Sequence, residues 1–104
     1  MEQPITTIGR TVIYMLKTSD AEAINRRRDH AKAHMDEHRA NATGVMVHVG
    51  NMAKTGEEYP MVITRVWGPD LVNGTVMLDG SDTFWATSVG QGDQPGMWHW
   101  PTRT

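Results

Sequence analysis

Three histidines in the charged middle of the chain, His30, His34 and His38, give the sharpest chemical signal in the sequence. Their spacing of four residues places them on one face of a helix, where imidazoles one turn apart can ligate the same metal ion. A zinc hydrolase of the His-Glu-x-x-His type needs glutamate directly after its first histidine, whereas Ala31 and Met35 follow here. We therefore predict no metal and no other cofactor. The three histidines remain a weak metal candidate, set against a solvated or partner-facing stripe.

Arginines could hold an anion at two places, the run Arg26, Arg27 and Arg28 and the single Arg65. Guanidinium keeps its charge and offers a fork that fits phosphate or carboxylate. Three successive helical residues fan over about 200° of the helix surface, so the run cannot converge on one small ligand. We expect one arginine to pack its stem on the sheet, one to pair with Glu22 or Asp29, and one to be free.

Aromatic side chains concentrate in the second half of the chain, at Tyr59, Trp67, Phe84, Trp85, Trp98 and Trp100. Exposed indoles can anchor a protein interface, stack on bases or cage a cation. Strand alternation forbids all of them from pointing inward, so if Phe84 points inward then Trp85 points outward. We take Trp67, Trp85, Trp98 and Trp100 as candidate partner-binding or ligand-binding residues beside the four arginines.

A catalytic group does not stand out. The sequence has no Gly-x-Ser-x-Gly nucleophile elbow, and the glycine-rich loop over 90–96 does not lead into a helix that could hold phosphate. Asp82, His48 and His99 could assemble with a serine in three dimensions, but no spacing indicates that they do. We predict that the protein is not an enzyme.

The elements that must position these residues begin with a β-branched and aromatic run, Thr11–Leu16, which predicts a strand. The pattern Ser19-x-x-Glu22 is typical of a capping box and predicts a helix from Asp20 to about Ala40. Apolar residues of this helix form one narrow stripe, at Ala21, Ile24, Ala31 and Met35. The helix should therefore lie across a sheet through that single face.

After Gly44 the sequence changes to short strands separated by turn residues, predicted over 45–49, 59–67, 75–78, 83–89 and 98–100. We predict an α+β fold, in which an N-terminal strand and one long helix pack on a small antiparallel SH3-like β-barrel or bent sheet. The chain of 104 residues is predicted to be a single domain, with a loose arm over 1–9, strand and helix over 10–43 and the barrel over 44–101.

The net charge, the lack of cysteine and the absence of long apolar runs limit the classes of partner that the sequence predicts. The net charge of -2 includes -3 over residues 41–104, from three basic and six acidic side chains, so long nucleic acid is an unfavourable partner. No cysteine is present to form a disulfide or a thiolate site, and no run is long and apolar enough to span a membrane. We expect a soluble, cytosolic protein without a membrane partner.

The assembled motifs His48-Val49-Gly50-Asn51, Tyr59-Pro60-Met61-Val62, Arg65-Val66-Trp67-Gly68, Phe84-Trp85-Ala86-Thr87-Ser88 and Trp98-His99-Trp100-Pro101 resemble a family of small proteins encoded by actinobacterial phages. The resemblance covers nearly the whole chain and implies a phage gene acting in the cytoplasm of a host bacterium. The family has no assigned activity, so no catalytic residue carries over.

Two functions follow as expectations. The first is a non-catalytic phage accessory module that binds a bacterial host protein or self-associates as a homo-oligomer, through exposed aromatics and the charged helix. The alternative is a nucleotide or nucleic-acid binder, for example a counter-defence protein that sequesters a small nucleotide signal. In that case Arg26, Arg27, Arg28 and Arg65 would hold phosphates while a tryptophan stacks on a base.

Overall fold

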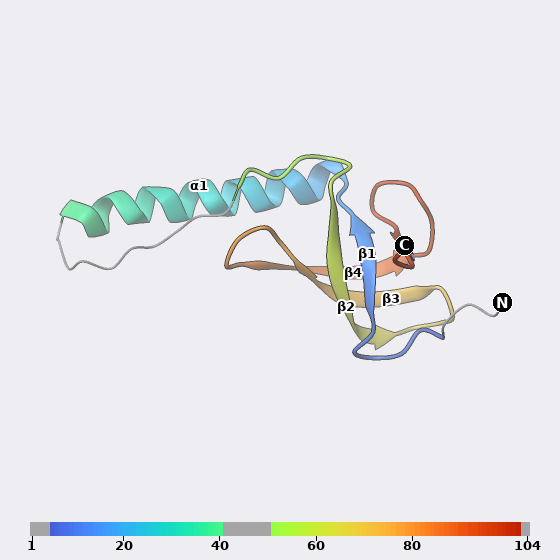
Figure 1. Ribbon diagram of the computed structural model, residues 1–104. Helices are drawn as coiled ribbons and strands as arrows, with labels where there is room; N and C mark the ends of the chain where they lie inside the picture. The colour runs from blue at the N-terminus through green and yellow to red at the C-terminus, as the bar shows by residue number, and fades with distance from the viewer. Residues whose placement is uncertain (1–4, 41–50, 103–104) are drawn as a thin grey trace.

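The computed structural model describes residues 5–40 and 51–102, with the side chains of 34–40 excepted. In chain order the elements are β1 (Thr11–Met15), α1 (Thr18–Ala40), β2 (Glu58–Val66), β3 (Leu71–Met77), β4 (Thr83–Gly90) and β5 (Trp98–His99). The five strands form one antiparallel sheet in the order β4-β3-β2-β1-β5. Figure 1 shows the sheet curled into a half-barrel with α1 along one side. The predicted α+β fold is confirmed.

Two register shifts interrupt the sheet: β2 has an extra residue opposite β3 between Ile63 and Arg65, and β4 has an extra residue opposite β3 between Ala86 and Val89. Such irregularities increase the local twist of a strand and allow a small sheet to curl on itself. Gly74 on β3 packs closely against β2, and a Cβ at this position would lie 2.4 Å from the Cγ of Met61. Glycine at this position therefore leaves room on β3 for the large side chain of Met61 on β2.

The concave face of the sheet holds the hydrophobic core. Fourteen buried apolar side chains form one cluster among the described residues, and Trp98, Tyr14, Leu16, Ile24 and Met61 are the largest of them. Trp98 also links the two ends of the curl. Its carbonyl accepts a hydrogen bond from Gly92 N–H at 2.8 Å, and its indole N–H donates to the carbonyl of Asp70 at 3.1 Å. One residue thus fastens β5 to the segment after β4 and to the β2–β3 turn.

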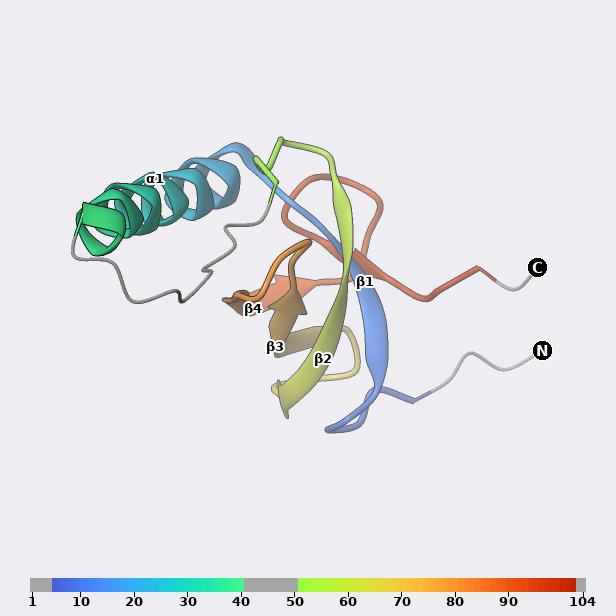
Figure 2. The same ribbon diagram turned by 60° about the vertical axis from the view of Figure 1, so that its left-hand side comes forward.

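Helix α1 packs on the sheet through its first turns. Ala21 and Ile24 are buried, whereas Ala31 is exposed, so the predicted apolar stripe covers the core over the first half of the helix. Met35 of that stripe lies among the side chains outside the description. Figures 1 and 2 show the rest of the helix running past the edge of the sheet. Burial on the sheet therefore does not account for the second half of α1.

The helix begins two residues earlier than the sequence predicts, and Ser19 is not its cap. The carbonyl of Lys17 accepts the first helical hydrogen bond, from Ala21 N–H at 3.1 Å. The Asp20 carboxylate accepts the Lys17 N–H at 3.2 Å and a short hydrogen bond from the Tyr14 hydroxyl. Asp20 thus plays the part that Glu22 was predicted to play, and the reason is tertiary: Tyr14 on β1 supplies a second donor for its carboxylate.

The strand and turn predictions agree with the structure in most places. The strand over 11–16 corresponds to β1, that over 59–67 to β2 and that over 83–89 to β4, while β3 begins four residues before the predicted strand over 75–78. Residues 92–96 form a loop, as predicted, whereas Gly90 ends β4 and Gln91 forms an isolated bridge with Trp98. The strand predicted over 45–49 and part of the loose arm lie outside the described residues.

Candidate functional site

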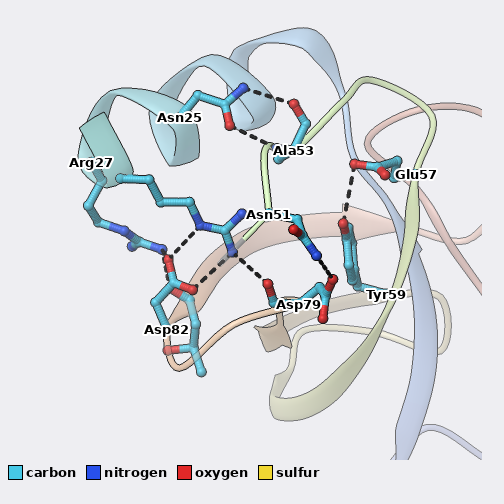
Figure 3. Close-up of polar contacts among 10 residues, drawn as sticks. Asn25, Arg27, Asn51, Ala53, Glu57, Tyr59, Asp79 and Asp82 are labelled. Atoms are coloured by element: carbon cyan, nitrogen blue, oxygen red, sulfur yellow. Dashed lines mark hydrogen bonds and ion pairs between the residues drawn. The ribbon is translucent and has the colours of Figure 1, made fainter. Parts of the chain in front are cut away.

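The arginine run fastens the helix to the sheet (Figure 3). Arg27 Nη2 lies 2.9 Å from Asp82 Oδ2, and Arg28 Nη2 lies 3.0 Å from Asp82 Oδ1. Arg28 also donates to the carbonyl of Asp79 at 3.4 Å and is buried, while Arg26 is exposed. The predicted divergence of the three side chains holds for Arg26 but is wrong for Arg27 and Arg28, which converge on the single carboxylate of Asp82. Their expected partners are wrong, because Asp82 on the β3–β4 turn takes the place of Glu22 or Asp29.

This pairing decides what the run can bind. Hydrogen bonds from Arg28 are the largest influence on Asp82 and lower the pKa of its carboxyl group, so Asp82 stays ionised at neutral pH. A phosphate would have to displace that carboxylate from two guanidinium groups. Arg27 and Arg28 are therefore structural residues, and of the run Arg26 alone makes no ion pair with Asp82.

The same polar cluster extends to the segment before β2 (Figure 3). Asn25 on α1 donates to the carbonyl of Ala53 and accepts its N–H, both at 2.8 Å. Asn51 donates to the Asp79 carboxylate at 2.5 Å. Burial is the main cause that raises the pKa of Tyr59, whose hydroxyl donates to Glu57 at 3.2 Å. These contacts hold α1, residues 51–57 and the β3–β4 turn together, which is a structural role.

Two of the candidate tryptophans belong to the interior. Trp98 is fully buried, so its assignment as a surface binding residue is wrong. Trp100 is half-buried and packs edge-on against Trp98, with ring centroids 5.2 Å apart and an interplanar angle of 89°. The guanidinium of Arg10 lies 6.0 Å from the Trp100 ring. The prediction that both indoles share one side of the last strand is confirmed, and that side is the core.

Trp67 and Arg65 form a pair at the surface. The Arg65 guanidinium stacks 4.2 Å from the centroid of the Trp67 ring, and Trp67 remains 53% exposed. The indole N–H donates to Asn73 Oδ1 at 3.0 Å, and the same oxygen accepts Ser88 N–H at 2.8 Å. Asn73 is buried, and Ser88 has a positive φ of 51° beside it. The indole is thus held in one orientation before any partner arrives.

Exposed apolar side chains also occur on the two chain segments at this end of the sheet. The N-terminal segment lies against the β2–β3 turn, because Thr6 donates to the carbonyl of Pro69 at 3.1 Å and Gly9 N–H donates to Ile63 at 2.8 Å. The two segments together expose Ile5 (75%), Ile8 (71%), Val66 (36%), Trp67 (53%) and Leu71 (38%). We call these five residues and Arg65 the hairpin-end surface. Figures 1 and 2 place the two segments at the end of the sheet remote from α1.

Trp85 is exposed elsewhere, on the convex face of the sheet. It stands opposite Thr75 on β3 and is 66% exposed, while the neighbouring Phe84 packs on the core. Met77, 46% exposed, lies two residues further along β3 on the same face. The predicted alternation of Phe84 and Trp85 is therefore confirmed. Trp85 and the hairpin-end surface are the two places where tryptophan meets solvent.

The histidine stripe is described only in part. His30 is exposed, and the side chains of His34 and His38 lie outside the description. In the portion of the chain that the structure describes, no three histidine, aspartate or glutamate side chains converge in a way that could hold a metal. Of the possible triad of Asp82, His48 and His99, Asp82 is held by arginines and His48 lies outside the described residues. His99 lies 3.7 Å from Glu58 instead.

Sequence reasoning found Arg65 and Trp67 but missed their apolar neighbours. Ile5 and Ile8 fall in a segment predicted to be a loose arm, and Val66 and Leu71 flank a turn without a recognisable binding motif. Asn73, which orients Trp67, also carries no signal in the sequence. The available hint is the presence of two isoleucines in an otherwise polar arm.

Comparisons with known proteins add no identification. No family model matches the chain, and no match was found among curated proteins or solved structures. No helix within the described residues has the length and apolar character that crossing a bilayer requires.

Proposed function

We propose that the protein is a non-catalytic interaction module whose hairpin-end surface binds a protein. The observation that carries the proposal is the exposed Arg65–Trp67 pair, together with four exposed aliphatic side chains on the same two segments. Tryptophan and arginine dominate the binding energy of protein interfaces, and large apolar patches on a protein surface mark interaction sites. Asn73 holds the indole in place, which lowers the conformational entropy that binding would otherwise cost.

The chemistry of the surface favours a protein over a nucleotide. Ile5, Ile8, Val66 and Leu71 offer aliphatic area that buries well against apolar side chains but does not stack on bases. The nucleotide alternative needs arginines that can hold phosphate, but Arg27 and Arg28 are already ion-paired with Asp82. Among the described residues, that alternative keeps the exposed Arg26 and Arg65, with Trp67 or Trp85 as a stacking platform.

The resemblance to phage proteins supports a bacterial protein as one class of partner, met in the host cytoplasm, and self-association as the other. The proposal that the protein is non-catalytic is supported by the structural roles of the groups whose pKa values are shifted. Tyr14, Tyr59 and Asp82 each hold elements of the fold together through hydrogen bonds.

The test is native mass spectrometry of untagged protein recovered from bacterial lysate, comparing the wild type with Trp67→Ala and Ile8→Ser. We expect both variants to lose the associated protein or the oligomer, with Trp67→Ala weakening association by roughly thirtyfold or more, as for an interface hot spot. Ile8 is 71% exposed, so its replacement leaves the fold intact. Trp85→Ala is the matched control for loss of an exposed indole.

Circular dichroism melting checks that the variants are folded. If the two hairpin-end variants retain every associated species of the wild type, the surface is not the binding site. An added mass of a few hundred daltons on the wild type, lost in Arg65→Ala, would favour the nucleotide alternative.

A further inference from the structure

The two edges of the sheet differ in how far they are protected. β5 is two residues long, and its Trp98 also forms a bridge with Gln91, so little of its backbone is open. β4 is eight residues long, and among the described strands it pairs with β3 alone. Natural edge strands commonly carry charged side chains or proline, which discourage pairing with another chain. Thr83–Gly90 contains neither, so the outer side of β4 offers backbone N–H and C=O groups to a further strand.

The regular part of this edge runs from Thr83 to Thr87, and we call it the open edge. Near its end β4 carries an extra residue opposite β3, and Ser88 adopts a positive φ of 51°, which ends the regular extended conformation. At its start the Thr83 carbonyl accepts a hydrogen bond from Arg27 Nη2 at 2.8 Å. Backbone groups at strand spacing are matched by another extended main chain, so the occupant that fits the open edge is a β-strand.

The composition of the open edge favours a second copy of the same strand. A twofold axis sets a strand antiparallel to its own counterpart, and a strand without charged side chains then places no like charges opposite each other. Residues directly opposite in an antiparallel pair lie on the same face of the sheet. Because Trp85 is exposed on the convex face whereas Phe84 packs on the core, odd positions must oppose odd positions. The axis that pairs every residue of the open edge passes through Trp85, so Trp85 opposes its counterpart and Thr83 opposes Thr87.

We propose that β4 of a second copy of this chain pairs antiparallel with the open edge, about a twofold axis at Trp85, and joins two sheets into one. This inference goes beyond the proposed function and does not rest on it, since it concerns a different surface. Two short strands pair only marginally in water, so the dimer forms at high protein concentration. It is absent at the dilution of native mass spectrometry, where Trp85→Ala stays a valid control for the hairpin-end surface.

The test is disulfide cross-linking between single-cysteine variants, because the chain has no cysteine of its own. Thr83→Cys and Thr87→Cys, mixed one to one at millimolar concentration under mild oxidation, place the two new thiols directly opposite each other. Opposite residues of antiparallel strands have the Cα separation that a disulfide requires. In either variant alone the two thiols lie four residues apart along the paired strands, about 13 Å. The mixture should therefore cross-link at least fivefold faster than either variant alone.

A mixture of Thr83→Cys and Thr64→Cys is the matched control for random collision, since Thr64 is exposed on β2. Equal rates in the two mixtures overturn the inference. Sedimentation velocity gives a second measurement without cross-linking. Trp85→Lys sets two ammonium groups against each other at the axis and should raise the dissociation constant at least tenfold. Met77→Lys makes the same change at a 46% exposed position on the same face of β3 and should dimerise like the wild type.

Melting curves confirm that every variant is folded. A wild type that stays monomeric at millimolar concentration overturns the inference. A foreign protein from the lysate that is lost in Trp85→Lys but retained in Trp67→Ala also overturns it, because the open edge then has a different occupant. Loss of a partner in Trp67→Ala alone bears on the hairpin-end surface, so failure of the dimer and failure of the proposed function are distinguishable.

Discussion

Replacing Asp82 by alanine should destabilise the protein because Arg28 would then be a nearly buried cation without its carboxylate. The Arg28 side chain is 7% exposed and that of Asp82 is 28% exposed, so the pair lies between a surface salt bridge and a fully buried one. Breaking a buried pair costs about 3–5 kcal/mol and breaking an exposed pair about 0–1 kcal/mol. Because Arg28 keeps its bond to the Asp79 carbonyl, we expect a loss of about 2 kcal/mol.

Urea unfolding followed by circular dichroism measures this loss, which corresponds to a fall in melting temperature of roughly 10 °C for a domain of this size. Arg27→Ala is the matched control, since its side chain is 47% exposed, and it should cost less than about 1 kcal/mol. In an Arg28→Met background the buried cation is absent, so Asp82→Ala should cost little there. An equal cost in both backgrounds would refute the argument.

The pH dependence follows from the lowered pKa of Asp82. A carboxylate whose pKa is lower in the folded state stabilises the protein above its unfolded pKa of about 4, and this contribution is lost as the pH falls through the folded value. The stability gap between the wild type and Asp82→Asn should therefore be constant from neutral pH to about pH 4 and narrow below it. A gap that is unchanged at pH 2 would show that the charge of Asp82 is not its source.

Two further predictions concern residues of the core. Trp98→Ala should cost about 3–5 kcal/mol of stability by opening a cavity, whereas the same change at the exposed Trp85 should cost less than about 1 kcal/mol, and urea unfolding of the two variants compares them. Tyr14→Phe should cost about 1–2 kcal/mol at neutral pH by depriving the buried Asp20 of a donor. Burial first, and then Asp20, raise the pKa of Tyr14, so its contribution is complete below about pH 10 and is lost above it. The difference between wild type and Tyr14→Phe should therefore narrow in alkaline unfolding experiments, and a difference that persists unchanged would contradict the assigned role.

The sequence determined the local elements because their signals are local. Strand alternation predicted that Phe84 and Trp85 point to opposite faces of the sheet, and the apolar period of the helix picked out Ala21 and Ile24 as buried. Each of these follows from a repeat of two or 3.6 residues, which the chain carries without reference to its distant parts.

Partners distant in the chain were decided by the tertiary structure. Asp82 lies 54 residues from Arg28, and no spacing rule connects them. Asp20 replaces the predicted cap because Tyr14 reaches it from β1, and Trp98 is buried because the curl of the sheet closes over it. The hairpin-end surface exists because the N-terminal segment lies against the β2–β3 turn. Some aromatic and charged residues stabilise the fold, and others stay exposed and can bind a partner. The contacts that form when the sheet curls decide which residues do which.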